Sequence, residues 1–176
     1  KRIIYSTYQA TSGSGIKGIL DLKMQTKNYY EKGITNNLIP VISYLNEDGY
    51  SGEEEKLIFE SKKILNNYSI DVNATCVRVS VENAHSINIV VECEKEADLE
   101  SLIHEYQKNK YIKFYKTDYP TPKEVDGSDL VHISRLRYAF NDKKWLSMFV
   151  IADNLRVGAA TNAIRILEKL VKGEVK

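Results

Sequence analysis

The chain has 176 residues, which is enough for one well-buried domain or at most two small ones. Its 25 Lys and Arg residues balance 24 Asp and Glu residues without any dense basic run, so the composition argues against a nucleic-acid partner. Apolar residues make up 43% of the chain, and none of the apolar stretches approaches the roughly 18 residues of a membrane span. We therefore expect a globular, cytoplasmic protein without a membrane partner.

The first 35 residues predict a strand followed by a helix. Residues 2–8 alternate as a strand does, and the small, glycine-rich break TSGSG follows at 11–15. Apolar residues then recur at helical spacing from Ile16 to about Tyr30, and Gly33 is expected to close this helix. Because the chain begins directly with a strand pattern and without Met, we expect it to start within a longer protein.

The next stretch predicts an irregular strand, a turn and a second helix. Residues 36–45 are apolar and β-branched, but Pro40 favours an edge or irregular strand, and 46–50 form a turn. Ser51 and Glu54 have the spacing of a capping box, so a helix is expected to begin there. Its predicted buried stripe consists of Leu57, Ile58, Ile64 and Leu65.

Residues 72–81 alternate strictly and predict a strand. One face is expected to pack through Val77, Val79 and Val81. The other face is mixed and carries Cys76, Arg78 and Ser80. After a bend at 82–84, residues 86–94 predict another strand. Neither Cys76 nor Cys93 has CxxC spacing, so two buried free thiols are expected.

A third helix is expected from about Glu96 to Lys108, with Leu99, Leu102, Ile103 and Tyr106 on its buried side. A short strand at 111–115 and a turn-rich loop at 118–129 follow it.

The last part of the chain predicts two strands and a helix. Residues 130–140 and 144–153 are expected to pair antiparallel through a turn at Asn141–Asp142. A final helix begins near Gly158, and its predicted buried residues are Ala160, Ala163, Ile164, Leu167 and Leu170. Strands that follow one another without intervening helices favour an α+β fold with a mixed, largely antiparallel sheet covered by helices.

A few polar residues are candidates for chemistry. Glu53 and Lys56 are three residues apart on one helix face, which suits either a solvated surface pair or a binding site. Arg78 lies in mid-strand, so it either reaches solvent or lines a polar cleft, where a guanidinium would anchor a carboxylate.

The histidines and the glycine-rich break offer weaker indications. His85 follows a bend that can aim it into a cleft, and its unperturbed pKa suits proton transfer, although a lone histidine is more often structural. His104 and His132 have no supporting context and are expected to be structural or exposed. The TSGSG break suits a phosphate or a nicotinamide edge, but glycines before helices are common. The sequence contains no metal-ligand cluster and no Ser/His/Asp constellation.

Taken together, these residues lie within motifs of a known family. The matching segments, in family order, are STYQATSGSG at 6–15, NNLIP at 36–40, EDGYSGEEEK at 47–56, ATCVRV at 74–79, His85-Ser86, YPTP at 119–122 and ADNLRVGAATNA at 152–163. The chain resembles the C-terminal catalytic and dimerisation domain of the aspartate-semialdehyde dehydrogenase family. The resemblance implies a fold like the C-terminal domain of glyceraldehyde-3-phosphate dehydrogenase, and a homodimer.

The resemblance also implies a reaction: interconversion of 4-phospho-L-aspartate and L-aspartate 4-semialdehyde plus phosphate, with NADP, in lysine, threonine and methionine biosynthesis. The family uses a cysteine thiolate as nucleophile. It further implies His85 as the general acid/base, Gln9 as the residue that orients the substrate, Arg78 on its α-carboxylate, Glu53 on its α-ammonium and Lys56 on phosphate. The residues implied for the nicotinamide end of NADP are Ser12, Gly13 and Asn154.

The chain also departs from the family. Neither the Asn-x-Asn-Cys nucleophile segment nor a dinucleotide-binding loop is found, so residues 1–176 are expected to be the catalytic and dimerisation domain alone, inactive by itself. Local departures are Val41 for a usual histidine, Ser80 for a proline and Ile87 for a glutamate. Two other hypotheses remain: an inactive relative that serves dimerisation or partner binding, and an acyl-phosphate reductase for a different acid, against which Glu53 and Arg78 argue.

Overall fold

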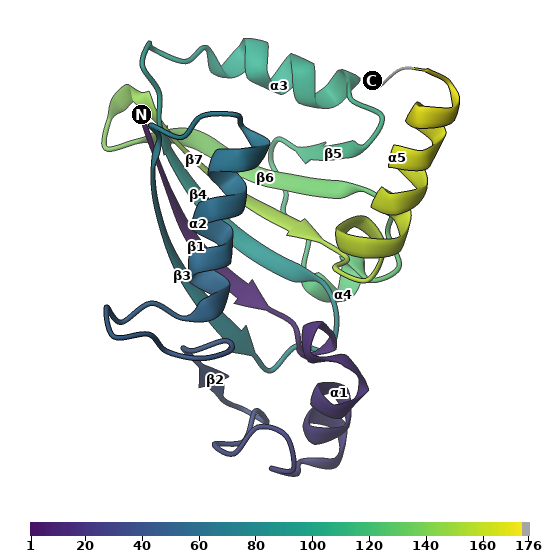
Figure 1. Ribbon diagram of the computed structural model, residues 1–176. Helices are drawn as coiled ribbons and strands as arrows, with labels where there is room; N and C mark the ends of the chain where they lie inside the picture. Colours follow the sequence, from purple (N-terminus) through teal and green to yellow (C-terminus); the bar gives the residue numbers. More distant parts are fainter. Residues whose placement is uncertain (174–176) are drawn as a thin grey trace.

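A seven-stranded mixed sheet forms the centre of the molecule in the computed structural model, which describes residues 1–173 (Figure 1). The strands are β1 (Arg2–Gln9), β2 (Leu38–Ile39), β3 (Asp71–Val79), β4 (His85–Glu92), β5 (Ile112–Tyr115), β6 (Val131–Ala139) and β7 (Asp142–Ala152). The helices are the 3-10 helix η1 (Thr11–Ser14), α1 (Gly15–Met24), α2 (Gly52–Ile64), α3 (Leu99–Lys108), α4 (Pro122–Val125), the π-helical η2 (Arg156–Ala160) and α5 (Thr161–Val171). The predicted α+β class is confirmed.

The order of the strands is β2-β3-β1-β4-β7-β6-β5, and it brings several strand ends together. β1 is parallel to β3 and antiparallel to β4, and β4 is antiparallel to β7. The last residues of β1, β3 and β7 therefore meet the first residue of β4 at one end of the sheet. In Figure 1 this is the lower end, where α1 and β2 also lie.

α2 lies along β1 and β3 on one face of the sheet (Figure 1). The Glu54 carboxylate accepts hydrogen bonds from the backbone N–H of Ser51 (2.7 Å) and of Cys76 on β3 (2.8 Å). The first of these contacts is the capping interaction that the sequence predicts. The second ties the start of the helix to a part of β3 that the two-residue β2 does not reach. Glu54 thus fixes the position of the first turn of α2 on the sheet.

The first helix is shorter than predicted because α1 ends at Met24 rather than near Tyr30. The buried Asp21 carboxylate accepts hydrogen bonds from the Thr26 hydroxyl (2.6 Å) and from three successive backbone N–H groups at 28–30. Burial raises the pKa of Asp21, but these hydrogen bonds outweigh it and lower the pKa to about 2. The chain therefore wraps around a carboxylate instead of continuing as a helix.

The two faces of β3 differ from the expectation. The valine face is only half-buried, whereas Ala74, Cys76 and Arg78 face α2 and are 4%, 0% and 5% exposed. The mixed face is the better covered one because α2 packs on it. Both cysteines are free, as predicted, but Cys93 is half-buried rather than buried.

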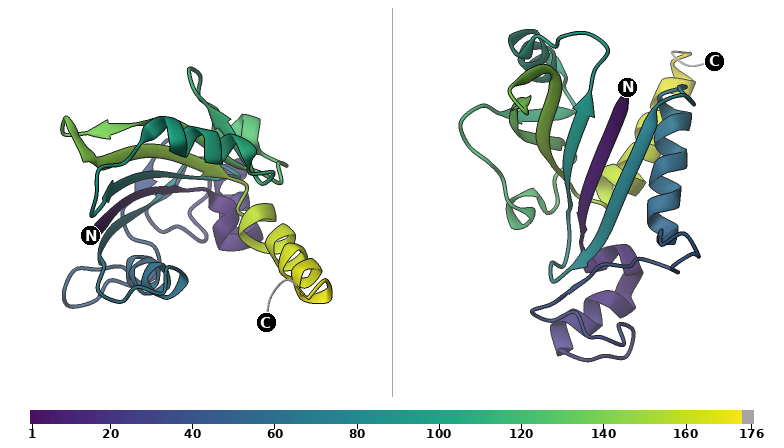
Figure 2. Two further views of the ribbon diagram at one scale, coloured as in Figure 1. Left: turned by 90° about the horizontal axis from the view of Figure 1, so that it is seen from above. Right: turned by 90° about the vertical axis from the view of Figure 1, so that its left-hand side faces the viewer.

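Two predicted apolar stripes remain largely uncovered. On α2, Ile64 and Leu65 are 80% and 53% exposed, although Leu57 and Ile58 are half-buried. On η2 and α5, all five residues predicted to be buried are exposed, and Figure 2 shows α5 projecting from the sheet. Helical periodicity identified the apolar faces correctly, but the partner that would cover them does not lie within the described residues.

The remaining elements agree with the predictions apart from their limits. β6 and β7 form the predicted antiparallel pair, with Phe140 and Asn141 in the left-handed conformation at the turn. α3 begins at Leu99, because the Asp98 side chain caps it at the Glu100 N–H, and its predicted buried residues are only half-buried. The short α4 lies within the predicted loop. None of the helices in residues 1–173 is long and apolar enough to cross a membrane.

Candidate active site

A cavity of about 760 Å³ opens at the end of the sheet where β1, β3 and β7 finish and β4 begins. Its wall includes all eight residues for which the sequence predicts a role in binding or catalysis, from five separate parts of the chain. They are Gln9, Ser12, Gly13, Glu53, Lys56, Arg78, His85 and Asn154. The fold therefore brings these residues together around one cavity.

The sheet itself places the residues at the base of this cavity. Gln9 is the last residue of β1, and it lies directly opposite Arg78 in the parallel ladder with β3. His85 is the first residue of β4 and pairs with Ala152 at the end of β7. These side chains are thus set by the register of the strands and not by a loop.

Arg78 is a buried cation with spare hydrogen-bond donors. Its side chain is enclosed, with 5% of the residue exposed, and Nη1 donates to the Ala10 carbonyl at 2.5 Å. Burial lowers the pKa of Arg78, and none of the ion pairs found within residues 1–173 includes it. A guanidinium has five N–H donors, so most of them remain available to a carboxylate ligand.

His85 is held in one neutral tautomer. Its Nδ1 accepts a hydrogen bond from the Ala10 backbone N–H (3.1 Å), so the ring proton of the neutral form resides on Nε2. Burial and the neighbouring Arg78 charge lower the pKa of His85 to about 4, against a smaller opposing effect of Asp153. At neutral pH the side chain therefore presents an uncharged Nε2–H donor.

Gly13 keeps open the space between these two residues. A Cβ at this position would lie 2.8 Å from Arg78 Nη1 and 3.1 Å from His85 Nε2. A side chain here would therefore displace the Arg78 guanidinium and crowd the imidazole. Glycine lets the backbone at this position approach both groups closely.

Glu53 and Lys56 form the rim of the cavity on α2. The Glu53 carboxylate accepts from Gln9 Nε2 at 3.3 Å and lies 3.6 Å from the Lys56 ammonium. Their side chains are 27% and 57% exposed, respectively. An ion pair this long and this exposed is weak, so both charges are available to a ligand.

Ser12 and Asn154 form the opposite wall. The Asn154 Nδ2 donates to the Ser12 hydroxyl oxygen at 2.9 Å, which joins the turn after β1 to the segment after β7. Together the walls offer a cation for a carboxylate, an anion for an ammonium, a second cation for phosphate and an imidazole for proton transfer.

Residues 1–157 match the dimerisation domain of the semialdehyde dehydrogenases. The chain belongs to this family. It is 42% identical to the aspartate-semialdehyde dehydrogenase of Aquifex aeolicus, over 98% of this chain and 55% of the relative. It therefore spans about half the length of the curated relatives that it matches.

Solved structures of family members have the same fold. The aspartate semialdehyde dehydrogenase II of Vibrio cholerae, solved in complex with ASA, has a TM-score of 0.92 and 37% identity, covering 97% of this chain and 55% of that one. The Candida albicans enzyme, solved with NADP, has a TM-score of 0.72 and 25% identity, covering 97% of this chain and 50% of that one.

Sequence reasoning missed several lining residues. Tyr29 and Tyr30 line the cavity because the Asp21 turn brings them back toward η1, and the Tyr30 hydroxyl donates to Ser14 Oγ at 2.7 Å. Val41, the predicted departure from the family pattern, is also a lining residue. The further lining residues are Ser14, Ile42, Ser43, Leu155 and Gly158. A tyrosine pair at a helix end carries no sequence signal for such a position.

The remaining candidate residues lie away from the cavity. His132 is buried between the Tyr115 and Ser128 hydroxyls, and His104 is exposed beside Glu105, so both are structural or exposed as predicted. Neither cysteine lines the cavity, and burial raises the pKa of Cys76, which disfavours a thiolate. Within residues 1–173 no group of three or more His, Cys, Asp and Glu side chains is arranged for a metal ion.

Proposed function

We propose that this chain supplies the substrate-binding and proton-transfer residues of a cytoplasmic, NADP-dependent aspartate-semialdehyde dehydrogenase. The reaction interconverts 4-phospho-L-aspartate and L-aspartate 4-semialdehyde plus phosphate, as a step in lysine, threonine and methionine biosynthesis. The observation that carries the proposal is the single cavity lined by all eight residues that match the family motifs. Membership of the family supports the same reaction class.

The charges in the cavity suit a zwitterionic amino acid that also carries phosphate. Arg78 binds the α-carboxylate, because it is enclosed and has no ion-pair partner of its own among the described residues. Glu53 binds the α-ammonium, and Lys56, one helical turn away, binds the phosphate. We assign to Gln9 the orientation of the reacting end, because it lies at the base of the cavity opposite Arg78.

His85 exchanges a proton through Nε2. Because Nδ1 is occupied by the Ala10 N–H, Nε2 is the ring nitrogen that remains for the substrate or the nucleophile. In the neutral form it donates a hydrogen bond, which stabilises a developing negative charge on the reacting oxygen.

The corner formed by Ser12, Gly13 and Asn154 fits the nicotinamide end of NADP. It is polar on one side, and Gly13 contributes only backbone to the lining there, next to Arg78 and His85. The bound cofactor supplies or accepts the hydride. We place the nucleophilic cysteine and most of the cofactor-binding surface in the part of the relatives that this chain does not span.

We also propose a homodimer. The face of the sheet opposite α2 is only partly covered, with Ile4 and Tyr8 36% and 42% exposed and the β3 valines half-buried. The dimerisation domain that the family description names supports this assembly.

The proposal is tested with the complete gene product. We expect phosphate-dependent reduction of NADP by L-aspartate 4-semialdehyde, and no turnover by the purified 176-residue chain. A Glu53→Gln variant should lose activity toward this substrate and not toward an analogue without the amino group. A complete protein that binds the substrate without turning it over would instead support an inactive relative. Loss of equal size with both substrates would rule out the role of Glu53.

A further inference from the structure

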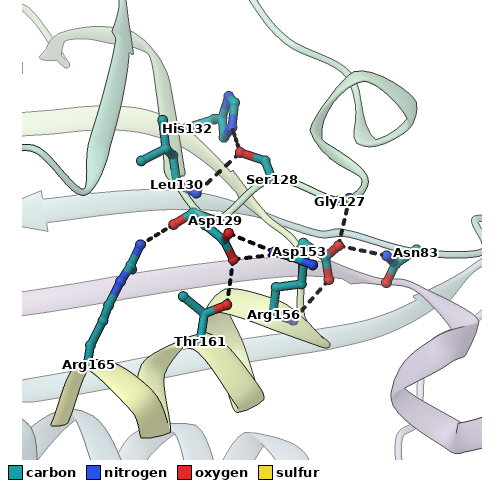
Figure 3. Close-up of polar contacts among 10 residues, drawn as sticks. All are labelled: Asn83, Gly127, Ser128, Asp129, Leu130, His132, Asp153, Arg156, Thr161 and Arg165. Carbon is teal, nitrogen blue, oxygen red and sulfur yellow. Dashed lines mark hydrogen bonds and ion pairs between the residues drawn. The ribbon is translucent and has the colours of Figure 1, made fainter. Parts of the chain in front are cut away.

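A second polar cluster lies directly behind the Ser12 and Asn154 wall, and the proposed function does not use it. Its centre is Asp153, which is 1% exposed at the end of β7 (Figure 3). Oδ2 accepts from Asn83 Nδ2 (3.0 Å) and the Gly127 N–H (2.8 Å), and Oδ1 from the N–H groups of Leu155 (2.9 Å) and Arg156 (3.1 Å). All four donors are uncharged groups. None of the ion pairs found in residues 1–173 includes this carboxylate.

The Asp153 charge fixes the orientation of Asn83. A carboxylate accepts hydrogen bonds only, so the Asn83 amide must turn its Nδ2 toward it. A second acceptor, Asp126 Oδ1, lies on the same side at 2.6 Å from Nδ2. The Asn83 Oδ1 therefore faces away from Asp153, toward Ser12, where it accepts from the Ser12 hydroxyl at 2.9 Å.

This contact in turn fixes the Asn154 amide. A serine hydroxyl has a single proton, and that of Ser12 is used in the bond to Asn83, so its oxygen acts as an acceptor for Asn154 Nδ2 (2.9 Å). The Asn154 Oδ1 lies 3.2 Å from the same hydroxyl, farther than the Asn83 Oδ1 at 2.9 Å, so the single proton goes mainly to Asn83. In this series of hydrogen bonds, from Asn154 through Ser12 and Asn83, each donor points toward Asp153, so the bonds reinforce one another.

We propose that Asn83 and Asp153 are positioning residues that hold the Asn154 amide with Oδ1 available to the cavity, so that this corner selects a ligand group with N–H donors. A primary carboxamide has that chemistry, whereas a ketone does not. The positioning of Asn154 is independent of the proposed function. The identity of the ligand, the carboxamide of a nicotinamide dinucleotide, rests on that function.

The test compares two ligands on the complete gene product. NADP and its 3-acetylpyridine analogue differ only in the replacement of the carboxamide by a methyl ketone, which has no N–H. We expect the wild type to bind NADP about three- to tenfold more tightly than the analogue, which is the range for one neutral hydrogen bond. Calorimetry measures both affinities. In Asn83→Leu the ratio should fall toward one, mainly through weaker binding of NADP.

Asp129→Asn is the matched control. Asp129 is also a carboxylate with several donors, the Arg156 guanidinium and the Thr161 hydroxyl, and it lies in the same region without a contact to Asn83 (Figure 3). This variant should keep the wild-type ratio. If Asn83→Leu does not fold, Ser12→Ala interrupts the same series of hydrogen bonds one step nearer to Asn154. This variant should reduce the ratio in the same way.

A second measurement is independent of ligand binding. In the free protein, one proton of the Asn154 side-chain amide should exchange slowly with solvent by nitrogen-resolved NMR, and Asn83→Leu should remove this protection. An unchanged ligand ratio together with unchanged exchange in Asn83→Leu would overturn the inference. Failure of the wild type to bind either dinucleotide would count against the proposed function, while the exchange measurement would still decide the role of Asn83.

Discussion

The base and the rim of the cavity hold their charged groups in different ways. At the base, Arg78 is buried near the end of β3 and His85 is half-buried at the start of β4, and backbone groups of Ala10 contact one atom of each. At the rim, Glu53 and Lys56 project from α2, and a 3.6 Å ion pair is their mutual contact. The base is therefore organised before any ligand binds, whereas the rim charges are partly exposed and screened by water. The four predictions that follow test this difference.

The largest effect is expected at the base, from Arg78→Met. Loss of a buried, directional cation should weaken binding of a carboxylate substrate by about 2–5 kcal/mol. The free energy of unfolding should change much less, because the apolar side chain replaces a desolvated cation that has no ion pair to break among the described residues. Calorimetric binding and urea unfolding measure the two quantities. Equal affinity in the variant would contradict a carboxylate-binding role. The affinity of Arg78→Lys for the substrate should lie between those of the wild type and Arg78→Met.

The second effect concerns pH. The pKa of His85 is lowered to about 4 in the folded chain, whereas an unfolded histidine titrates near 6.5. Between these values the unfolded chain binds a proton that the folded chain does not, so stability falls as the pH falls from 6.5 to 4 and is then constant. The contribution is about 3 kcal/mol. Between pH 6.5 and pH 4, the free energy of unfolding in urea should fall by that amount more in the wild type than in His85→Gln. Other titrating groups affect both proteins alike.

A third effect links base and rim. Glu54→Gln removes the carboxylate that accepts from both Ser51 and Cys76, and its amide can replace only one of these contacts. We expect a loss of about 1–3 kcal/mol in the free energy of unfolding, together with weaker substrate binding as the first turn of α2 loosens. Glu55→Gln is the control: its carboxylate contacts Tyr44 and Asn46 nearer the surface. A cost no greater than that of the control would show that Glu54 does not anchor the helix.

The smallest effect is expected at the rim, from Lys56→Met. An exposed cation contributes about 1 kcal/mol or less to binding a phosphate, and the contribution should decline as salt is added. Phosphate affinity measured at low and high ionic strength should differ more for the wild type than for the variant. Lys63→Met, on the exposed surface of the same helix, makes the same change in net charge and should have no effect.

The sequence was sufficient for most of the fold and for the identity of the main site residues. Strict alternation located β3, and capping chemistry placed the start of α2 at Ser51. The residues at the cavity were identified through motif resemblance, because Glu53, Arg78 and His85 are far apart in the chain and no local pattern joins them.

Other features depend on contacts that periodicity does not encode. The end of α1 is set by Asp21, a single residue whose carboxylate accepts from groups up to nine positions later. The α5 stripe was recognised as apolar, but burial depends on what packs against it. Asn83 lies in a bend without a motif, and its importance emerges only from the orientation of Asp153 and Ser12.

The pairing of Gln9 with Arg78 has a consequence for how this domain tolerates changes in length. They lie at or next to the ends of neighbouring strands that run in the same direction, so the long connection between those strands can grow or shrink without moving either side chain. An extra residue inside β3 would instead rotate Arg78 to the half-covered valine face and remove its charge from the cavity. Variation among homologous proteins should therefore accumulate in the connection and be excluded from the strands.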